Sequence, residues 1–194
     1  MSLMLALALL TTAPSAEPVN EYGYAPSCAR WTSRTTPPRT IRVFRADLHR
    51  VDRVPFRLYV QRVMASGAWP AYKPMESLND GAIVVKQYAW YEALRGHRTG
   101  WGQCFDIRDG GWGQYYRSDV TVHSRIRRAV RATWPISLRK NGRFFRTGWR
   151  GYGGRCGQVV NGWHLFEDGV TDCARRGMGW RHILRVYLDP VAIR

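Results

Sequence analysis

The sequence has few acidic residues and few lysines. Its 194 residues contain 14 Asp and Glu against 30 Lys and Arg, which gives a formal net charge of +16 at pH 7. Only Lys73, Lys86 and Lys140 are lysines, so the excess is nearly all arginine. This balance excludes an acidic, solvating chain and predicts a negatively charged partner, because a basic surface attracts polyanions. A basic solvated surface without a specific partner is the alternative.

Long apolar runs are also missing. The run at residues 3–10 is too short to cross a bilayer, which takes about 20 apolar residues, and no later run is longer. This excludes an integral membrane protein. Small residues around Ala13 and Ala16 follow the run, as in a secretory signal peptide with its cleavage site. We therefore expect residues 1–16 to be a signal peptide and the protein to be secreted or held in the cell envelope, the alternative being a disordered tail.

Cysteines with metal-ligand spacing are absent. The four cysteines lack a Cys-x-x-Cys pair and the histidines are scattered, so we expect no zinc site, no other metal and no cofactor. An even cysteine count in an exported chain predicts two disulfides. Spacing alone leaves three pairings open. We favour Cys28 with Cys104, which would attach the N-terminal segment, and Cys156 with Cys173, which would close a short loop.

Length and composition predict one globular domain. The chain can bury one core but is too short for two domains of ordinary size. Residues 17–39 are rich in Pro, Ser, Thr and Tyr, which indicates an extended arm held by Cys28. The domain itself should span residues 40–194.

Hydrophobic periodicity predicts a strand followed by two helices. In "RTIRVFRADL" (39–48), Ile41 and Val43 alternate with arginines, as in a half-buried strand. A short amphipathic helix should run from Pro55 to Gly67. A longer one should run from Pro74 to Gly96. The apolar face of the longer helix comprises Leu78, Ala82, Val85 and Ala89.

Strands and turns dominate the middle of the chain. Asn141-Gly142 lies between alternating segments, which is the strongest hairpin signal in the sequence. Residues 122–138 indicate a short helix or turn that leads into a strand, and "MGWRHILRVYL" (178–188) a final helix before Pro190. We expect an α+β fold with a central helix pair, a strand-rich middle and a C-terminal helix.

Four segments in order resemble the family of sporulation stage II protein D and the amidase enhancers (SpoIID/LytB). "FRLYVQRVMASGAWP" and "ESLNDGAIVVKQYAWY" are similar to the family's "YLxGVVxxEMP…EALKAQAVAARTYA". "FDIRDGGWGQYY" stands where the family has "YDVxDxxxxQxY", and "CARRGMGWRHILRVYLDP" where it has "GxxxxGxSYxxILxxYY". The resemblance covers most of the chain after residue 50.

The resemblance implies work on peptidoglycan. Members are lytic transglycosylases or partners of cell-wall amidases, and they handle glycan strands of N-acetylglucosamine and N-acetylmuramic acid. The transglycosylase reaction needs a carboxylic acid at the scissile bond, which in the family is the Glu of its "EMP" step. Here Ala68 stands in that place, followed by Trp69 and Pro70, and a methyl group cannot transfer a proton.

Other residues could take part in a site of this kind. Asp106, Asp109 and Glu76 are weak substitutes for the acid, since turn, strand and helix-dipole roles explain them better. His97, His123, His164 and His182 are isolated and are expected to be neither ligands nor bases. The resemblance places four glycan-binding candidates around its groove, although each could instead pack in the core: Trp69, Lys86, Tyr88 and Trp90.

The leading hypothesis is an exported SpoIID-like protein that binds peptidoglycan glycan strands or anionic wall polymers and has little or no lytic activity. An amidase partner is implied by the resemblance. The alternative is an active lytic transglycosylase that uses another carboxylate. A basic nucleic-acid-binding protein is a third hypothesis, which the signal-like N-terminus and the paired cysteines disfavour.

Overall fold

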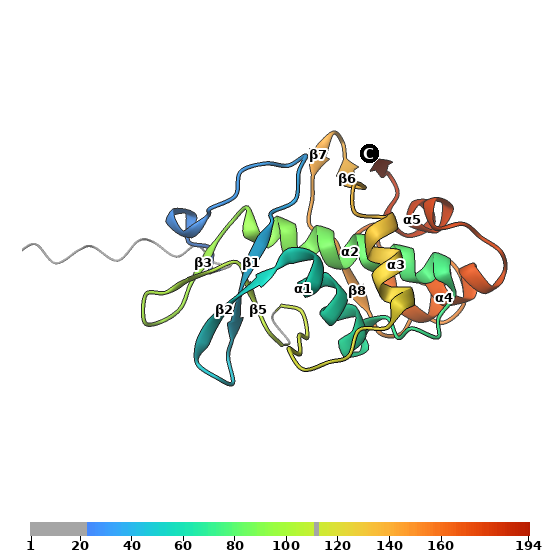
Figure 1. Cartoon of the computed structure of the whole chain (residues 1–194). Coiled ribbons are helices and arrows are strands. Elements are labelled where there is room, and N and C mark those ends of the chain that lie inside the picture. The colour runs from blue at the N-terminus through green and yellow to red at the C-terminus, as the bar shows by residue number, and fades with distance from the viewer. Residues whose placement is uncertain (1–22, 111–112) are drawn as a thin grey trace, which may run out of the picture.

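Helix α2 (Met75–Ala93) runs through the middle of the computed structural model, which describes residues 23–110 and 113–194 (Figure 1). The expected signal peptide lies outside the described residues. Fifteen of the nineteen α2 residues are buried, so most of the helix surface is enclosed and not only its predicted apolar face. It packs against four other helices: α1 (Phe56–Val63), α3 (Ser124–Ala132), α4 (Glu167–Arg175) and α5 (Trp180–Leu188).

The two predicted central helices are both present, joined by an irregular turn. Helix α1 continues into the π-helical turn η2 (Met64–Ala68), in which Gly67 has φ of 125°. That positive φ suits glycine, which lacks the Cβ that strains other residues there. Pro74 then precedes α2, where its fixed φ suits a helix start.

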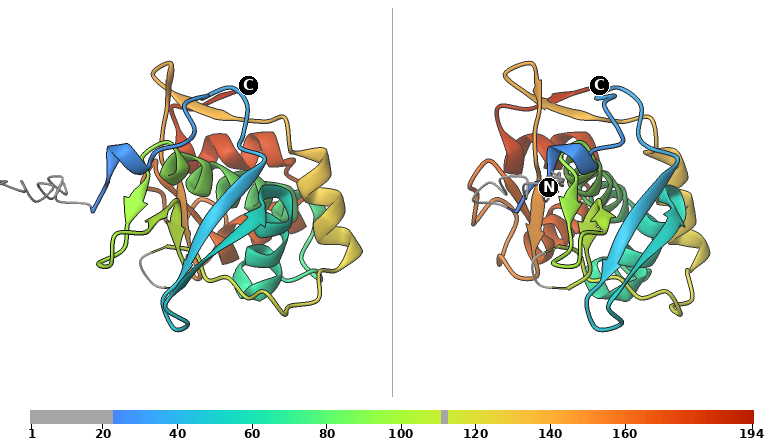
Figure 2. Two further views of the ribbon diagram at one scale, coloured as in Figure 1. Left: turned by 60° about the vertical axis from the view of Figure 1, so that its left-hand side comes forward. Right: turned by 90° about the vertical axis from the view of Figure 1, so that its left-hand side faces the viewer.

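A three-stranded sheet lies on one side of α2 (Figure 2). Strand β1 (Thr40–Arg45) pairs antiparallel with β2 (Arg50–Pro55) and parallel with β5 (Ile107–Arg108). Ile41 and Val43 face the core as predicted. Arg45 also faces inward, where Asp109 is its ion-pair partner 3.0 Å away.

The other strands are short. The hairpin at Asn141-Gly142 is confirmed, with φ of 50° and 73° at these two residues, and it joins β6 (Leu138–Lys140) to β7 (Arg143–Phe144). The C-terminal strand β10 (Ala192–Ile193) pairs with β6. The remaining pairs are β3 (His97–Arg98) with β4 (Cys104–Phe105), antiparallel, and β8 (Gly148–Arg150) with β9 (His164–Phe166), parallel.

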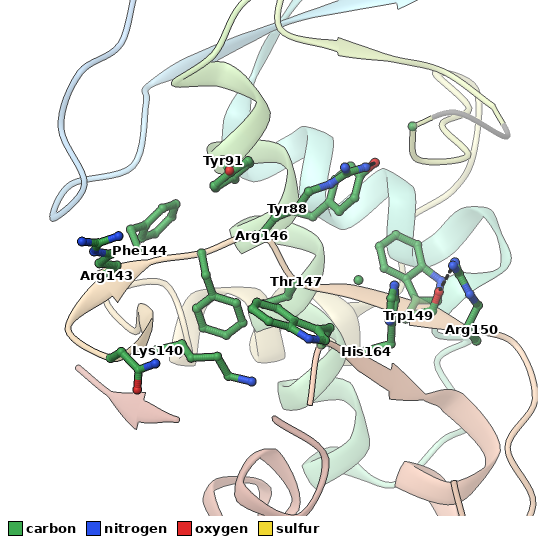
Figure 3. A pocket seen from close by; sticks show the side chains of 15 residues that line it. Tyr88, Tyr91, Lys140, Arg143, Phe144, Arg146, Thr147, Trp149, Arg150 and His164 are labelled. Atoms are coloured by element: carbon green, nitrogen blue, oxygen red, sulfur yellow. Dashed lines mark hydrogen bonds between the residues drawn. The ribbon is translucent and has the colours of Figure 1, made fainter. Parts of the chain in front are cut away.

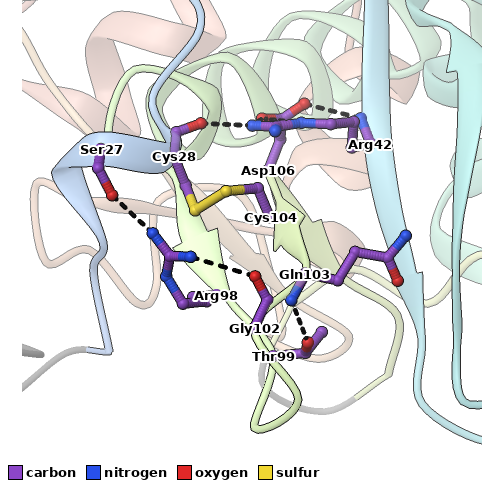
Figure 4. Close-up of a disulfide and its surroundings, with 9 residues drawn as sticks. All are labelled: Ser27, Cys28, Arg42, Arg98, Thr99, Gly102, Gln103, Cys104 and Asp106. Atoms are coloured by element: carbon purple, nitrogen blue, oxygen red, sulfur yellow. Dashed lines mark hydrogen bonds and ion pairs between the residues drawn. A yellow bond between two sulfur atoms is a disulfide. The ribbon is translucent and has the colours of Figure 1, made fainter. Parts of the chain in front are cut away.

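Both favoured disulfides are confirmed. Cys28, at the end of the 3-10 turn η1 (Pro26–Cys28), bonds to Cys104 of β4, and this bond holds the N-terminal arm to the body (Figure 4). Cys156 bonds to Cys173 of α4. Two disulfides are typical of proteins outside the reducing cytosol.

The expected α+β class is confirmed, and its last helix, α5, lies where the periodicity predicts it. Helix α4 is an element that the sequence reading missed. Within the described part of the chain, no helix has both the length and the apolar character needed to cross a membrane.

Candidate ligand-binding groove

A groove of about 1100 Å³ opens along the outer face of α2 (Figure 3). Its wall is formed by α2, the β6–β7 hairpin, β8 and the start of β9. Aromatic and cationic side chains predominate in its lining, and no carboxylate is among the described residues that line it. The aromatic residues are Tyr88, Tyr91, Phe144, Phe145, Trp149 and Trp163, and the cationic ones are Lys140, Arg143, Arg146 and Arg150.

Most of this lining comes from one extended segment, "RFFRTGWR" (143–150). Phe144 is buried against Trp90, with ring centroids 4.6 Å apart, and Phe145 meets the edge of Trp163 at 5.8 Å. With these rings anchored in the core, the arginines of the segment remain exposed. The same segment therefore supplies apolar anchors and outward-facing charges.

Arg146 is held in place on the groove wall. Its Nε lies 3.0 Å from Glu92 Oε1, its Nη2 donates to the hydroxyl of Tyr88 at 2.6 Å, and its guanidinium lies 4.7 Å from the Tyr88 ring centroid. Burial raises the pKa of Tyr88, so this hydroxyl stays protonated at neutral pH. By contrast, Arg143 and Arg150 form no ion pair within the described part of the chain. Their charges are available to a ligand.

The far end of the groove carries Lys140, Trp163 and His164. Lys140 Nζ donates to the carbonyl of Gly162 at 2.6 Å and lies 4.2 Å from the Trp163 ring centroid. Burial, together with Arg150 and Arg146, lowers the pKa of His164 below its ordinary value of 6.5. The imidazole is therefore neutral at pH 7.

Of the four glycan-binding candidates, only Tyr88 lines the groove. Trp69 has no exposed surface, its Nε1 donates to Ser77 Oγ at 3.2 Å, and its ring meets the edge of Trp149 at 5.7 Å. A ring without exposed surface cannot stack on a sugar. The proposed stacking role of Trp69 is therefore corrected to that of a core residue that supports Trp149, which does line the groove.

Lys86 and Trp90 are also core residues. The Lys86 ammonium, on a side chain only 1% exposed, donates to the carbonyls of Thr133, Trp134 and Ile136 at 2.8, 2.7 and 2.6 Å. Burial lowers the pKa of Lys86 to about 7, while these three acceptors favour the charged form. Trp90 is 1% exposed and donates to the carbonyl of Ser33, so it fixes the N-terminal arm. Neither side chain lines the groove.

The three candidate substitutes for the acid all have structural partners. Asp106 accepts the backbone N–H of Arg42 at 2.7 Å and also pairs with its guanidinium (Figure 4). Asp109 pairs with Arg45, and Glu76 accepts the N–H of Trp180 at 2.9 Å, at the start of α5. None of the three lines the groove.

Ala68 ends the turn η2, directly before Trp69. Trp69 in turn contacts Trp149, which lines the groove. The turn η2 is therefore connected to the groove wall through these two rings.

The sequence reading missed most of the groove. Its signal is present in residues 143–150, where arginines and aromatic residues alternate just after the hairpin. Arginine interleaved with aromatic residues is common on surfaces that bind charged polymers. That residues 143–150 form a groove wall follows only from the position of α2 beside them, which the hydrophobic periodicity of the sequence does not predict.

No protein-family model and no curated protein matches this chain. Among the described residues, no three His, Cys, Asp or Glu side chains come together to hold a metal ion. The site therefore has to be interpreted from its own chemistry.

Proposed function

We propose that this protein is an exported wall-binding protein of the SpoIID and amidase-enhancer type. It binds the glycan strands of peptidoglycan or an anionic wall polymer in the groove along α2, and does not cleave them. The observation that carries the proposal is the lining of the groove, in which four cationic and six aromatic side chains occur with no carboxylate among the described residues.

The chemistry of this lining suits an acidic sugar polymer. Aromatic rings stack on the apolar faces of sugars, and guanidinium groups pair with carboxylates through two parallel hydrogen bonds. Arg143 and Arg150 are the charges free for such pairs, whereas Arg146 is committed to Glu92. Trp149 and Trp163 supply ring surface in the same hollow.

The lack of lytic activity follows from the carboxylates. Glycan cleavage needs a carboxylic acid that protonates the leaving oxygen, and loss of such a group costs about 10²- to 10⁴-fold in rate. Asp106, Asp109 and Glu76 each serve a structural contact, and Ala68 cannot transfer a proton. The groove therefore supports binding without chemistry.

Single-stranded nucleic acid is the second candidate ligand, because aromatic and cationic grooves also bind bases and phosphates. The two disulfides favour a wall polymer, since they are typical of an exported protein.

The test compares binding of three polymers: denuded glycan strands, the same strands with their carboxylates amidated, and single-stranded DNA. We expect tight binding only to the unmodified strands. This binding should weaken as salt is added, because the Debye length, over which charges attract one another, falls to about 3 Å at 1 M salt. Trp149→Ala and Arg150→Gln should each weaken binding by about tenfold, or ~1.4 kcal/mol. Matched controls are Trp101→Ala, an exposed tryptophan outside the groove, and Arg128→Gln on α3.

Two outcomes would overturn the proposal. One is equal binding of amidated and unmodified strands, which would remove the role of the arginines. The other is tighter binding of DNA than of glycan, which would favour the second candidate.

A further inference from the structure

The tautomer of the neutral His164 ring is set by Asn161. The side-chain Oδ1 of Asn161 accepts the backbone N–H groups of Trp163 and His164, at 3.0 and 2.9 Å. The amide therefore presents Nδ2 to His164 Nδ1, 3.1 Å away. Because an amide nitrogen only donates, Nδ1 must accept, and the proton of the neutral ring is on Nε2.

His164 lies in the lining of the groove, where strands β8 and β9 pair. The ring lies against Gly148 of β8, where an added Cβ would come within 2.8 Å of Cδ2 and 3.2 Å of Nε2. Gly148 and His164 are paired in the register of β8 and β9. No hydrogen bond to Nε2 is formed by the described residues. A donor is thus held beside Trp149 and Arg150 in a hollow (Figure 3).

Charges around His164 oppose its protonation. Arg150 of β8 and Arg146 just before it are the cations that act on the imidazole, in addition to its burial. The three carboxylates of α4, which packs against β9, are engaged or exposed: Glu167 pairs with Lys73, Asp172 pairs with Arg176, and Asp168 faces solvent. Asp189, beyond α5, acts on Lys140. Helix α5 directs Arg181, His182 and Arg185 to a separate hollow.

We propose that His164 Nε2–H and Arg150 form a subsite for an anionic oxygen group of the ligand, a carboxylate or a phosphate, and that filling it converts His164 to the imidazolium. This inference rests on the proposed function of the groove and specifies what its ligand must carry. The proton comes from solvent and is taken up by Nδ1, which then becomes a donor. The side chain of Asn161 must therefore rotate so that its amide oxygen faces Nδ1, or move away from the ring.

The sign of the pH effect follows from linkage. A bound anion offsets the repulsion from the two arginines, so the pKa of His164 is higher in the complex than in the free protein. Binding then takes up a proton, and affinity rises as pH falls from above the bound-state pKa to below the free-state pKa. Each unit by which the pKa rises gives about tenfold in affinity.

The experiment measures affinity between about pH 8 and about pH 5.5, where carboxylates and phosphodiesters keep their charge and an imidazole titrates. Two probes separate the sources of the anion: denuded glycan strands, which carry carboxylates, and polyglycerol phosphate. The variants are His164→Gln, which keeps a neutral donor but cannot titrate, and His182→Gln as the matched control on α5. The imidazole signals of the full-length protein are followed by NMR in the same series.

We expect affinity for one or both probes to rise about tenfold toward low pH in the wild type and in His182→Gln. In His164→Gln it should stay flat, and the wild-type His164 signal should titrate at higher pH in the complex. A pH-independent wild-type affinity, an unchanged slope in His164→Gln, or an unshifted His164 titration would overturn the inference while leaving the groove intact. Failure of both probes to bind at any pH would instead overturn the proposed function.

Discussion

At the scale of single residues, the buried polar groups divide into those with hydrogen-bond partners and those without. Lys86 and Asp106 are enclosed and fully engaged, whereas both carboxylate oxygens of Asp80 are buried without a hydrogen-bond partner among the described residues. Burial raises the pKa of Asp80 well above its ordinary value, with a smaller contribution from Glu76. The carboxyl is held in its protonated form, because burial without partners penalises the charge.

Asp80→Asn should raise stability, and more so at higher pH. In the unfolded chain Asp80 ionises near pH 4, whereas in the fold it keeps its proton to higher pH. Over that window the folded state binds more protons, so the free energy of unfolding of the wild type falls as pH rises. Asparagine removes this fall, and the gain should reach about 1–3 kcal/mol. Urea denaturation at several pH values measures it, with the exposed Asp47→Asn as control. A gain that is already present at low pH would show that ionisation is not its cause.

Position 68 carries the prediction on catalysis. The native protein should release no 1,6-anhydromuramic ends from denuded glycan, because no carboxylic acid stands where the resemblance requires one. Ala68→Glu supplies an acid at the end of η2, next to the turn residue Trp69, and should release some of these ends. Ala68→Gln is the matched control, since it has a side chain of the same length without an acid. Product analysis by chromatography measures both.

Release of anhydro ends by the native protein would contradict this account. Asp106→Asn, Asp109→Asn and Glu76→Gln would then identify the acid, although loss of their structural contacts requires that folding be checked in each.

The site was only partly predictable at this scale. The sequence places Tyr88 and Trp90 two residues apart on a helix, yet one lines the groove and the other holds the arm in the core. Trp69 illustrates the same limit, because its burial depends on contacts with Ser77 of α2 and Trp149 of β8, and residue type does not predict either contact. Residue type cannot distinguish a core tryptophan from a stacking one.

At the scale of elements, the sequence predicted those helices and turns that short-range signals in the chain mark. Proline and glycine bounded α1 and α2, and Asn-Gly specified the β6–β7 hairpin. Helix α4 was missed because it is short, contains Gly169, and is stabilised by tertiary contacts and the bond at Cys173. The inward position of Arg45 was not predicted, because a charged residue is buried only where it has a partner. That partner, Asp109, is 64 residues away in the sequence and is brought close only by the fold.

The contact between η2 and α2 depends on Gly81. A Cβ built on Gly81 would lie 2.4 Å from Cδ2 of the Trp69 ring. Gly81→Ala should therefore lower the free energy of unfolding by about 1–3 kcal/mol, even though alanine favours a helix by about 1 kcal/mol. Thermal and urea unfolding measure the change. In a Trp69→Leu background the same substitution should cost less, and an equal cost in both backgrounds would show that the ring is not the cause.

At the scale of the whole molecule, the two disulfides have separable roles. The Cys28–Cys104 bond spans 76 residues and the Cys156–Cys173 bond spans 17, so removal should cost about 4.5 and about 3 kcal/mol on the chain-entropy estimate. The shorter loop carries Trp163 and His164 of the groove, whereas the groove residues of the longer loop, Tyr88 and Tyr91, are held in place by the buried helix α2. Cys156→Ser with Cys173→Ser should therefore weaken glycan binding as well as stability. Cys28→Ser with Cys104→Ser is the control and should lower stability alone. Binding and unfolding of the two paired variants measure both effects, and equal losses of binding would contradict this assignment.

The central claim is that the groove along α2 is the glycan-binding site, and the tryptophans offer a direct test. Their indole N–H signals in an NMR titration with denuded glycan strands report the site residue by residue. The account predicts that Trp149 and Trp163, which line the groove, shift with increasing ligand. The signal of Trp90, which is buried and hydrogen-bonded to the carbonyl of Ser33, should not shift. Trp101, which is exposed on the β3–β4 loop, is the surface control. Shifts confined to Trp101, or none in Trp149 and Trp163 when binding is saturated, would contradict the account.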